Sequence, residues 1–348
     1  MTQKELRGQK LVRDAAHAVL RMHTRRHFLK ESAMGLGALA IGTLLGGCDT
    51  KLSAKSSVVF DPSHPLMPKQ PQFPGKAKSV IYLHMAGAPW QLELFDYKPE
   101  LMKMDGQDCP HSLLEGKRFA FIRGVPKMLG PQARFAQHGE CRAYVSEHMP
   151  HLSTVVDELT FLKAVTTDQF NHAPAQLMVH TGSPRLGRPS LGSWVTYGLG
   201  TENQNLPGFI VLTSGGFNPD AGKSVWGSGF LPTAYQGVPL LNGPEPILNL
   251  TNPPGIDRTR QRDFFATVEK LNSARLAAVG DPEIATRIDA YEMAFRMQTS
   301  VPELMDISQE PKAVLDMYGA EPGKASFANN CLLARRLAER DVRFVQLY

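Results

Sequence analysis

The residues best suited to chemistry lie in the segment 171–182, NHAPAQLMVHTG. Its residues 173–182 are typical of a helix that Gly182 closes. A helix N-terminus has free N–H groups and a partial positive charge, so it attracts anions. An imidazole at that position can bind zinc or act as a base or nucleophile, which makes His172 the first candidate catalytic residue. Asn171 is the second, with helix capping as the alternative.

Two carboxylates form a second candidate group. Glu93 and Asp96 lie in the stretch QLELFDYKPELMKM, which follows an apolar, β-rich run at 79–87. That run predicts a buried strand. Carboxylates and imidazoles bind divalent cations, so Glu93, Asp96 and His172 are the candidate ligands of a metal such as zinc, calcium or magnesium. Asp96 could instead cap the turn before Lys98.

Two further histidines are expected to be structural. His84 lies within the first apolar run, where a core position is the simplest interpretation. His180 follows His172 by about two helical turns and is expected to pack against the fold. The sequence has no CxxC and no Cys/His cluster, which disfavours a cysteine-based zinc site.

These residues need a scaffold, and the chain predicts a mostly parallel sheet with helices on both faces, an α/β fold. Apolar strands are expected at 79–87, 159–165, 208–213 and 342–348. Helices are expected at 142–158, 173–182, 190–200, 257–299 (broken at 280–282) and 324–340, and a hairpin around 117–125. The usual nucleotide-binding signatures are missing. The strand 342–348 is either a terminal edge of the sheet or part of a fragment whose site continues beyond it.

The first 48 residues predict an export signal. A basic segment, TRRHFLK, precedes an apolar run that is shorter than the roughly 20 residues of a membrane-spanning helix. Arg25 and Arg26 resemble a twin-arginine signal, which implies the twin-arginine export machinery as a partner. The sequence LGGC at 45–48 resembles a lipoprotein cleavage site. Cys48 would then carry a lipid that holds the protein to a membrane, in the periplasm or cell envelope.

The charge distribution separates this leader from the rest. The net charge is +5, and the first 31 residues hold eight of the 38 Lys and Arg and three of the 33 acids. The remainder therefore has 30 of each and is neutral, so no nucleic-acid partner is expected. Residues 49–77 are rich in Ser, Lys and Pro and predict a linker, followed by a domain at 78–348.

Three segments together resemble one bacterial family: SVIYLHMAGAPWQLELFDYKPEL, FNHAPAQLMVHTGSPRLGRPSLGSWVTYGLG and LLARRLAERDVRFVQLY. It is an exported family of unknown function in the alkaline-phosphatase/sulfatase superfamily, with a leader of the same type. The resemblance implies an alkaline-phosphatase-like fold and metal-assisted hydrolysis of a phosphate or sulfate ester. Members continue past the last strand into Trp-Asp-x-His and other ligand-bearing motifs. The resemblance therefore implies a truncated, incomplete domain that is inactive or nearly so.

The sulfatases of that superfamily begin their catalytic helix with Cys-x-Pro-x-Arg and have Thr-Gly later. On that pattern, His172 falls at the nucleophile, Pro174 matches and Gln176 replaces the arginine. Because His172 is not a cysteine, the resemblance excludes chemistry through a modified cysteine.

A function of another class stays open beside the hydrolase. A non-catalytic, lipid-anchored envelope protein could bind a glycan or a protein partner. Trp90, Trp194 and Trp226 would then supply stacking surfaces.

Overall fold

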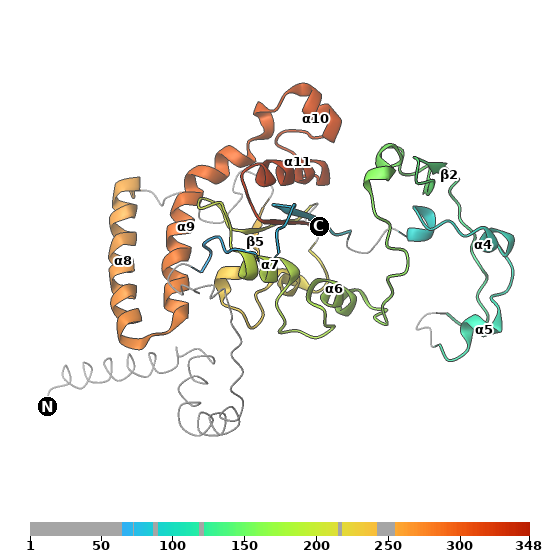
Figure 1. The fold of residues 1–348 in the computed structure, drawn as a ribbon, viewed down its shortest axis with the longest axis horizontal. Helices are drawn as coiled ribbons and strands as arrows, with labels where there is room; N and C mark the ends of the chain where they lie inside the picture. Colours follow the sequence, from blue (N-terminus) through green and yellow to red (C-terminus); the bar gives the residue numbers. More distant parts are fainter. Residues whose placement is uncertain (1–64, 72, 86–89, 118–121, 215–217, 242–254) are drawn as a thin grey trace, which may run out of the picture. The chain divides into compact units, whose positions relative to one another are not determined.

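A computed structural model describes residues 65–71, 73–85, 90–117, 122–214, 218–241 and 255–348 (Figure 1). It divides the chain into two compact units. We call residues up to His84 together with Ala173–Tyr348 the sheet unit, and Met85–His172 the inserted unit. The leader residues Arg25, Arg26 and Cys48 lie outside the described residues. No helix in the described ranges has the length and hydropathy to cross a membrane.

The sheet unit contains four parallel strands, so the predicted α/β fold is confirmed. Their order is β1 (Val80–Leu83), β6 (Phe344–Leu347), β4 (Phe209–Leu212) and β5 (Val238–Leu240). β6 pairs with β1 on one side and with β4 on the other, and all four of its residues are buried. The terminal-edge alternative for 342–348 is therefore wrong. A strand whose residues are apolar apart from Gln346 is suited to this central position.

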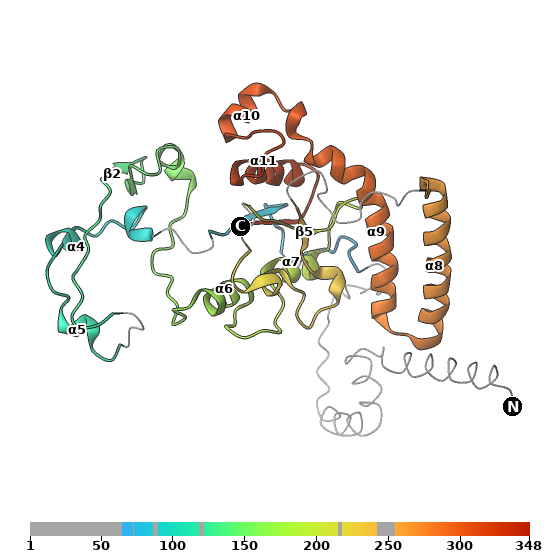
Figure 2. The ribbon, with the colours of Figure 1, turned by 180° about the vertical axis from the view of Figure 1, so that it is seen from behind.

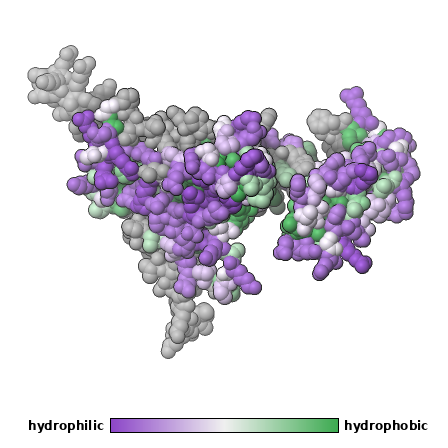
Figure 3. Space-filling view, turned by 90° about the horizontal axis from the view of Figure 1, so that it is seen from above, coloured by the Kyte–Doolittle hydropathy of each residue, from purple (hydrophilic) through white to green (hydrophobic). Residues whose placement is uncertain are grey.

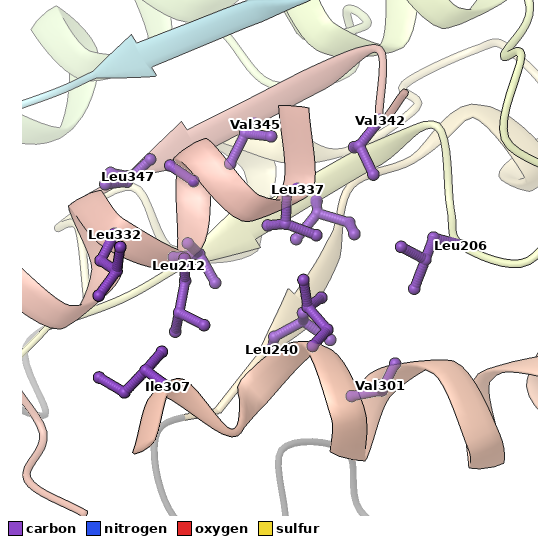
Figure 4. Packing of buried hydrophobic residues seen from close by; sticks show 14 of the residues in the cluster. Leu206, Leu212, Leu240, Val301, Ile307, Leu332, Leu337, Val342, Val345 and Leu347 are labelled. Atoms are coloured by element: carbon purple, nitrogen blue, oxygen red, sulfur yellow. The ribbon is translucent and has the colours of Figure 1, made fainter. Parts of the chain in front are cut away.

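Helices cover both faces of the sheet, as predicted (Figures 1 and 2). Alternate residues of β4 and β6 point to opposite sides. Ile210 and Val345 join one core with α9 (Pro282–Met305), α10 (Lys312–Tyr318) and α11 (Phe327–Ala338). Figure 4 shows Leu332 and Leu337 of α11 and Val301 of α9 in this core. Phe209 and Phe344 join the other core, with α6 (His172–Thr181), α7 (Leu191–Leu199) and the 3-10 helix η3 (Gly222–Trp226).

β1 differs from its prediction as a buried strand. Within the described sheet it pairs only with β6, and Val80, Ile81 and Leu83 are exposed. Only Tyr82 is half-buried, on the face that carries α6. The apolar run did identify a strand, but hydropathy alone does not separate an edge strand from a central one.

The helical predictions in the sheet unit hold where their boundary signals are strong. Ser190 caps α7 by accepting the N–H of Ser193, as expected. Gly280, with a positive φ of 70°, ends α8 (Arg258–Val279), and Asp281 caps the start of α9. α8 has no buried residue and packs against α9.

The inserted unit contradicts two predictions, a helix and a strand. It contains a hairpin formed by β2 (Phe135–His138) and β3 (Ala143–Ser146). The hairpin expected around 117–125 stays a prediction, because 118–121 lie outside the described residues. The predicted helix 142–158 begins as β3, because Gly139 and Arg142 adopt positive φ and reverse the chain before it. The remaining elements are short: α4 (Pro99–Lys103), α5 (His111–Leu114), and the 3-10 helices η1 (Gln91–Glu93) and η2 (Leu152–Glu158).

The predicted strand 159–165 in the inserted unit is also wrong. Leu162 and Val165 are 74% and 75% exposed, and no strand forms there. Short apolar runs are the pattern that single-sequence reasoning separates least well.

Part of the predicted linker 49–77 is bound to the sheet unit. The carbonyl of Leu66 accepts the Thr201 N–H at 2.9 Å, and the Lys69 N–H donates to the Leu199 carbonyl at 2.9 Å. The 3-10 helix η4 (Thr233–Tyr235) contributes a further bond, because the Tyr235 hydroxyl donates to the Pro65 carbonyl at 3.1 Å. Figure 3 shows that the visible surface of the described residues is mainly hydrophilic.

Candidate functional site

The carboxyl ends of the parallel strands carry an aromatic and imidazole cluster. His84 follows β1, Tyr348 follows β6, and His180 comes from the last turn of α6. The ring centroids of His84 and His180 are 4.6 Å apart, and Tyr348 lies 5.4 Å and 5.7 Å from them. Ligands of open α/β sheets bind at this edge. We call His84 and His180 the histidine pair.

Hydrogen bonds connect His180 of the histidine pair to β6. Gln346, fully buried on β6, donates its side-chain N–H to the Tyr348 hydroxyl. That hydroxyl lies 3.3 Å from His180 Nε2, and the tautomer of the imidazole decides which of the two groups donates. The Oε1 atom of Gln346 has no hydrogen-bond partner among the described residues.

Burial sets the charge state of the cluster. Burial, followed by the charge of the nearby His84, lowers the pKa of His180 to about 3. Burial also lowers the pKa of His84 and raises the pKa values of Tyr82 and Tyr348. At neutral pH the site therefore presents two uncharged imidazoles beside a protonated phenol. The uncharged imidazole is the form that binds transition metals.

Polar groups continue along the edge toward β4. The Ser214 N–H donates to the Tyr348 carbonyl at 3.0 Å. Asn330, fully buried near the start of α11, donates to the Ser214 hydroxyl at 2.8 Å. The Asn330 Oδ1 atom has no partner within the part of the chain that the structure describes. These groups give the edge hydrogen-bonding capacity beyond the histidine pair.

The structure places the candidate catalytic residues elsewhere. The helix predicted for 173–182 is confirmed, and Gly182 ends it with a φ of 71°. His172 is its first residue and is exposed, as is Asn171. His172 precedes His180 by eight residues, which is about 12 Å along a helix axis. The imidazole that α6 brings to the strand ends is therefore His180 and not His172.

The candidate metal carboxylates have protein partners inside the inserted unit. Both oxygens of Glu93 accept backbone N–H groups, from Gln132 at 3.0 and 3.1 Å and from Ala133 at 2.9 Å. Asp96 forms an ion pair with Lys98 at 2.8 Å. Over the described ranges, no three His, Cys, Asp or Glu side chains gather into a group that could hold a metal. Glu93, Asp96 and His172 are thus not brought together as a ligand set.

Gln176, which stands at the position of the sulfatase arginine, hydrogen-bonds to another segment of the sheet unit. It is buried, its Oε1 accepts the Ala221 N–H at 3.0 Å, and its Nε2 donates to Asp220 at 3.2 Å. It therefore ties α6 to the loop before η3.

Comparison with known proteins identifies the family of this chain. One family, described as a protein of unknown function, matches residues 77–348. The chain belongs to the DUF1501 family. No curated protein and no solved structure matches it.

Sequence reasoning missed the histidine pair of this DUF1501 chain, although one signal was present. His84 directly follows the last residue of β1, and side chains at that point of an open α/β sheet face the ligand edge. The partner, His180, could not be found in this way. Its approach to His84 depends on how α6 packs across the sheet, and sequence spacing does not record that.

Proposed function

We propose that the parent activity of this DUF1501 domain is hydrolysis of a phosphate or sulfate ester with the help of a divalent metal, at the carboxyl ends of its parallel sheet. The observation that carries the proposal is the histidine pair. The buried His180 and the half-buried His84 are uncharged at neutral pH, and their ring centroids lie 4.6 Å apart, next to the Tyr348 hydroxyl. The resemblance of the sequence to the alkaline-phosphatase/sulfatase superfamily supports the same reaction class.

The donor set of the histidine pair fits a zinc-like ion. Imidazole nitrogens are common zinc ligands, and lowered pKa values mean that protons do not compete for them near neutral pH. His84 and His180 would supply two protein ligands. A metal held there would polarise the ester and stabilise the leaving oxygen.

The neighbouring side chains would orient the substrate. Because its pKa is raised, Tyr348 keeps its proton at neutral pH and can donate a hydrogen bond to an ester oxygen. Ser214 and Asn330 add polar groups toward β4. His172 and Asn171 remain candidates for attack or anion binding at the start of α6, where both are exposed.

The proposed location is the cell envelope. The twin-arginine pair Arg25 and Arg26 and the lipid attachment at Cys48 support export and membrane anchoring, and both rest on the sequence alone.

Zinc titration and ester turnover test the proposal. The probes are zinc alone, by calorimetry on the chain from residue 49, and p-nitrophenyl phosphate and sulfate. We expect His84→Gln and His180→Gln each to weaken zinc binding by at least about tenfold, and His172→Gln to leave zinc affinity unchanged. Circular dichroism would check that each variant folds. Equal zinc affinity in folded wild type and in both folded histidine-pair variants would mean that the histidine pair does not bind zinc.

A second function is favoured by one surface feature. Trp194 and Phe230 are 43% and 63% exposed and their rings meet edge to face at 5.7 Å, whereas Trp226 is buried. Exposed aromatic pairs of this kind can stack on sugars. Saturable binding of soluble glycan oligomers that Trp194→Ala abolishes, in protein that binds no zinc, would favour the glycan-binding envelope protein.

A further inference from the structure

Gln346 is a buried polar side chain on the strand that leads to Tyr348. Its exposed fraction is 0%, and the other residues of β6 are apolar. It shares a face of the sheet with Phe344 and Tyr348, because alternate residues of a strand point to the same side. A buried amide without hydrogen bonds costs free energy, so the partners of Gln346 indicate why it lies there.

Two acceptors fix the orientation of the Gln346 amide. Its Nε2 atom lies 3.4 Å from the Val225 carbonyl oxygen and also donates to the Tyr348 hydroxyl. A backbone carbonyl can only accept a hydrogen bond, so the nitrogen of the amide, and not its oxygen, faces these two groups. The two N–H bonds of Gln346 therefore serve Val225 and Tyr348.

The Tyr348 hydroxyl in turn engages one nitrogen of His180. A tyrosine hydroxyl has one proton to donate and two lone pairs that accept, and Gln346 uses one of these lone pairs. Towards His180 Nε2, at 3.3 Å, the hydroxyl can either donate its proton or accept one. Nε2 is engaged in both arrangements. Nδ1 is then the nitrogen of His180 that is left for a ligand.

Ring contacts hold the His180 imidazole beside this hydroxyl. Tyr82 meets the imidazole edge to face, with ring centroids 5.2 Å apart, and the His84 ring lies 4.6 Å from it on another side of the cluster. His180 itself is 3% exposed. Because packing restricts the ring, the hydrogen bond to Tyr348 determines which nitrogen stays available.

We propose that Gln346 is a positioning residue, which through Tyr348 commits Nε2 of His180 to the protein and leaves Nδ1 as the ligand-binding atom. The identity of the ligand, a zinc-like ion shared with His84, rests on the proposed function. A neutral imidazole that binds a metal through one nitrogen carries its proton on the other. Nε2–H then donates to the Tyr348 hydroxyl, whose own proton is free for an ester oxygen.

Nitrogen NMR of the metal-free chain from residue 49, with isotope-labelled histidine, tests this positioning without metal or substrate. Long-range proton–nitrogen correlations show which ring nitrogen of His180 carries the proton. We expect a single tautomer in wild type and a mixture of both in Tyr348→Phe, because the phenyl ring cannot hydrogen-bond to Nε2. Gln346→Met, which supplies an apolar side chain of similar length, should change the ratio in the same direction by less.

Tyr82→Phe is the matched control for these variants. It makes the same substitution at another ring that contacts His180, and it removes no hydrogen bond found among the described residues. Its tautomer ratio should match that of wild type. Circular dichroism checks that each variant folds. A mixture of tautomers in wild type, or a ratio in folded Tyr348→Phe equal to that of wild type, would overturn the proposal.

Zinc calorimetry then tests the ligand. Groups that hydrogen-bond to a metal-binding histidine are worth about 10- to 100-fold in metal affinity. Tyr348→Phe and Gln346→Met should therefore weaken zinc binding by about tenfold, whereas Tyr82→Phe should bind like wild type. In zinc-loaded wild type the metal-bound nitrogen should be His180 Nδ1, and zinc at Nε2 would contradict the proposal. Wild type that binds no zinc but shows the expected tautomers would contradict the proposed metal and still support the positioning of His180.

Discussion

The two units of the molecule are stabilised by different interactions. In the sheet unit, apolar side chains of β4, β6, α9 and α11 form a continuous buried core. In the inserted unit, carboxylates hold loops through backbone N–H groups. Glu93 binds the amides of Gln132 and Ala133, and Asp157 binds the amides of Glu140 and Cys141.

This difference explains why carboxylates are ambiguous in a sequence. An ionised carboxylate is a pure acceptor, and a metal cation and a pair of backbone N–H groups satisfy it equally well. Glu93 was a reasonable metal ligand by residue type. Its observed partners lie about 40 positions further along the chain, at a distance where no local pattern indicates the pairing.

The largest effect should come from the core of the sheet unit. Leu337 on α11 is fully buried, so Leu337→Ala should lower the free energy of unfolding by about 2–5 kcal/mol. Urea denaturation followed by circular dichroism measures the change. Leu162→Ala, at an exposed leucine of the inserted unit, should change it by less than about 0.5 kcal/mol. Similar losses in the two variants would show that the units do not differ as described.

An intermediate effect should appear in the pH dependence of stability. The pKa of His180 is about 3 in the folded protein and about 6.5 in an unfolded chain, so the unfolded state binds more protons between these values. The contribution of His180 to the free energy of unfolding is present in full above pH 6.5. It should be lost as the pH is lowered toward 3, and the loss should amount to a few kcal/mol.

Thermal melts of wild type and His180→Gln between pH 4 and 7.5 measure this term. The variant should show a flatter profile below pH 6.5, whereas His148→Gln, at an exposed histidine, should follow wild type. Parallel profiles for all three proteins would mean that His180 is not buried in its uncharged form.

The smallest effect should come from the inserted unit. Glu93→Gln removes the charge that assists three hydrogen bonds, and should destabilise the loop at 132–133 by about 1–2 kcal/mol. Hydrogen exchange of the Gln132 and Ala133 amides should speed up, with little change in β4 and β6. Glu100→Gln, in an exposed pair with Lys103, is the control. Unchanged exchange at both amides would mean that Glu93 is not the anchor of this loop.

The sequence predicted those parts of the fold whose signals are local. Ser190 at a helix start and Gly280 before Asp281-Pro282 place helix boundaries directly, and both predictions are confirmed. Three of the four described strands of the sheet unit, β1, β4 and β6, were predicted from their apolar runs, whereas the three-residue β5 was missed. The inserted unit was predicted poorly, since its short elements depend on turns and on distant carboxylate contacts.

For the candidate site, the sequence pointed to the segment after β1 and to the start of α6, whereas the histidine pair comes from the residue next to β1 and from the last turn of α6. The expected site joined Glu93 and Asp96 to His172, whereas the strand ends bring together His84 and His180. Whether a residue of a helix faces a strand end depends on the angle at which that helix packs. That angle is set by side chains from many parts of the chain, including Phe209 and Phe344.

The central place of β6 has a consequence for how the protein is made. Val80 pairs with Phe344, and Phe344 also pairs with Phe209. Within the described sheet, β1 and β4 are therefore joined through β6, which is synthesised more than 130 positions after Phe209. A nascent chain can form α7 or the α8–α9 pair on the ribosome, but it cannot close the sheet until β6 emerges. Such distant pairing is slow, and it leaves the apolar residues of β4 without their β6 neighbours until residues up to Leu347 have been synthesised.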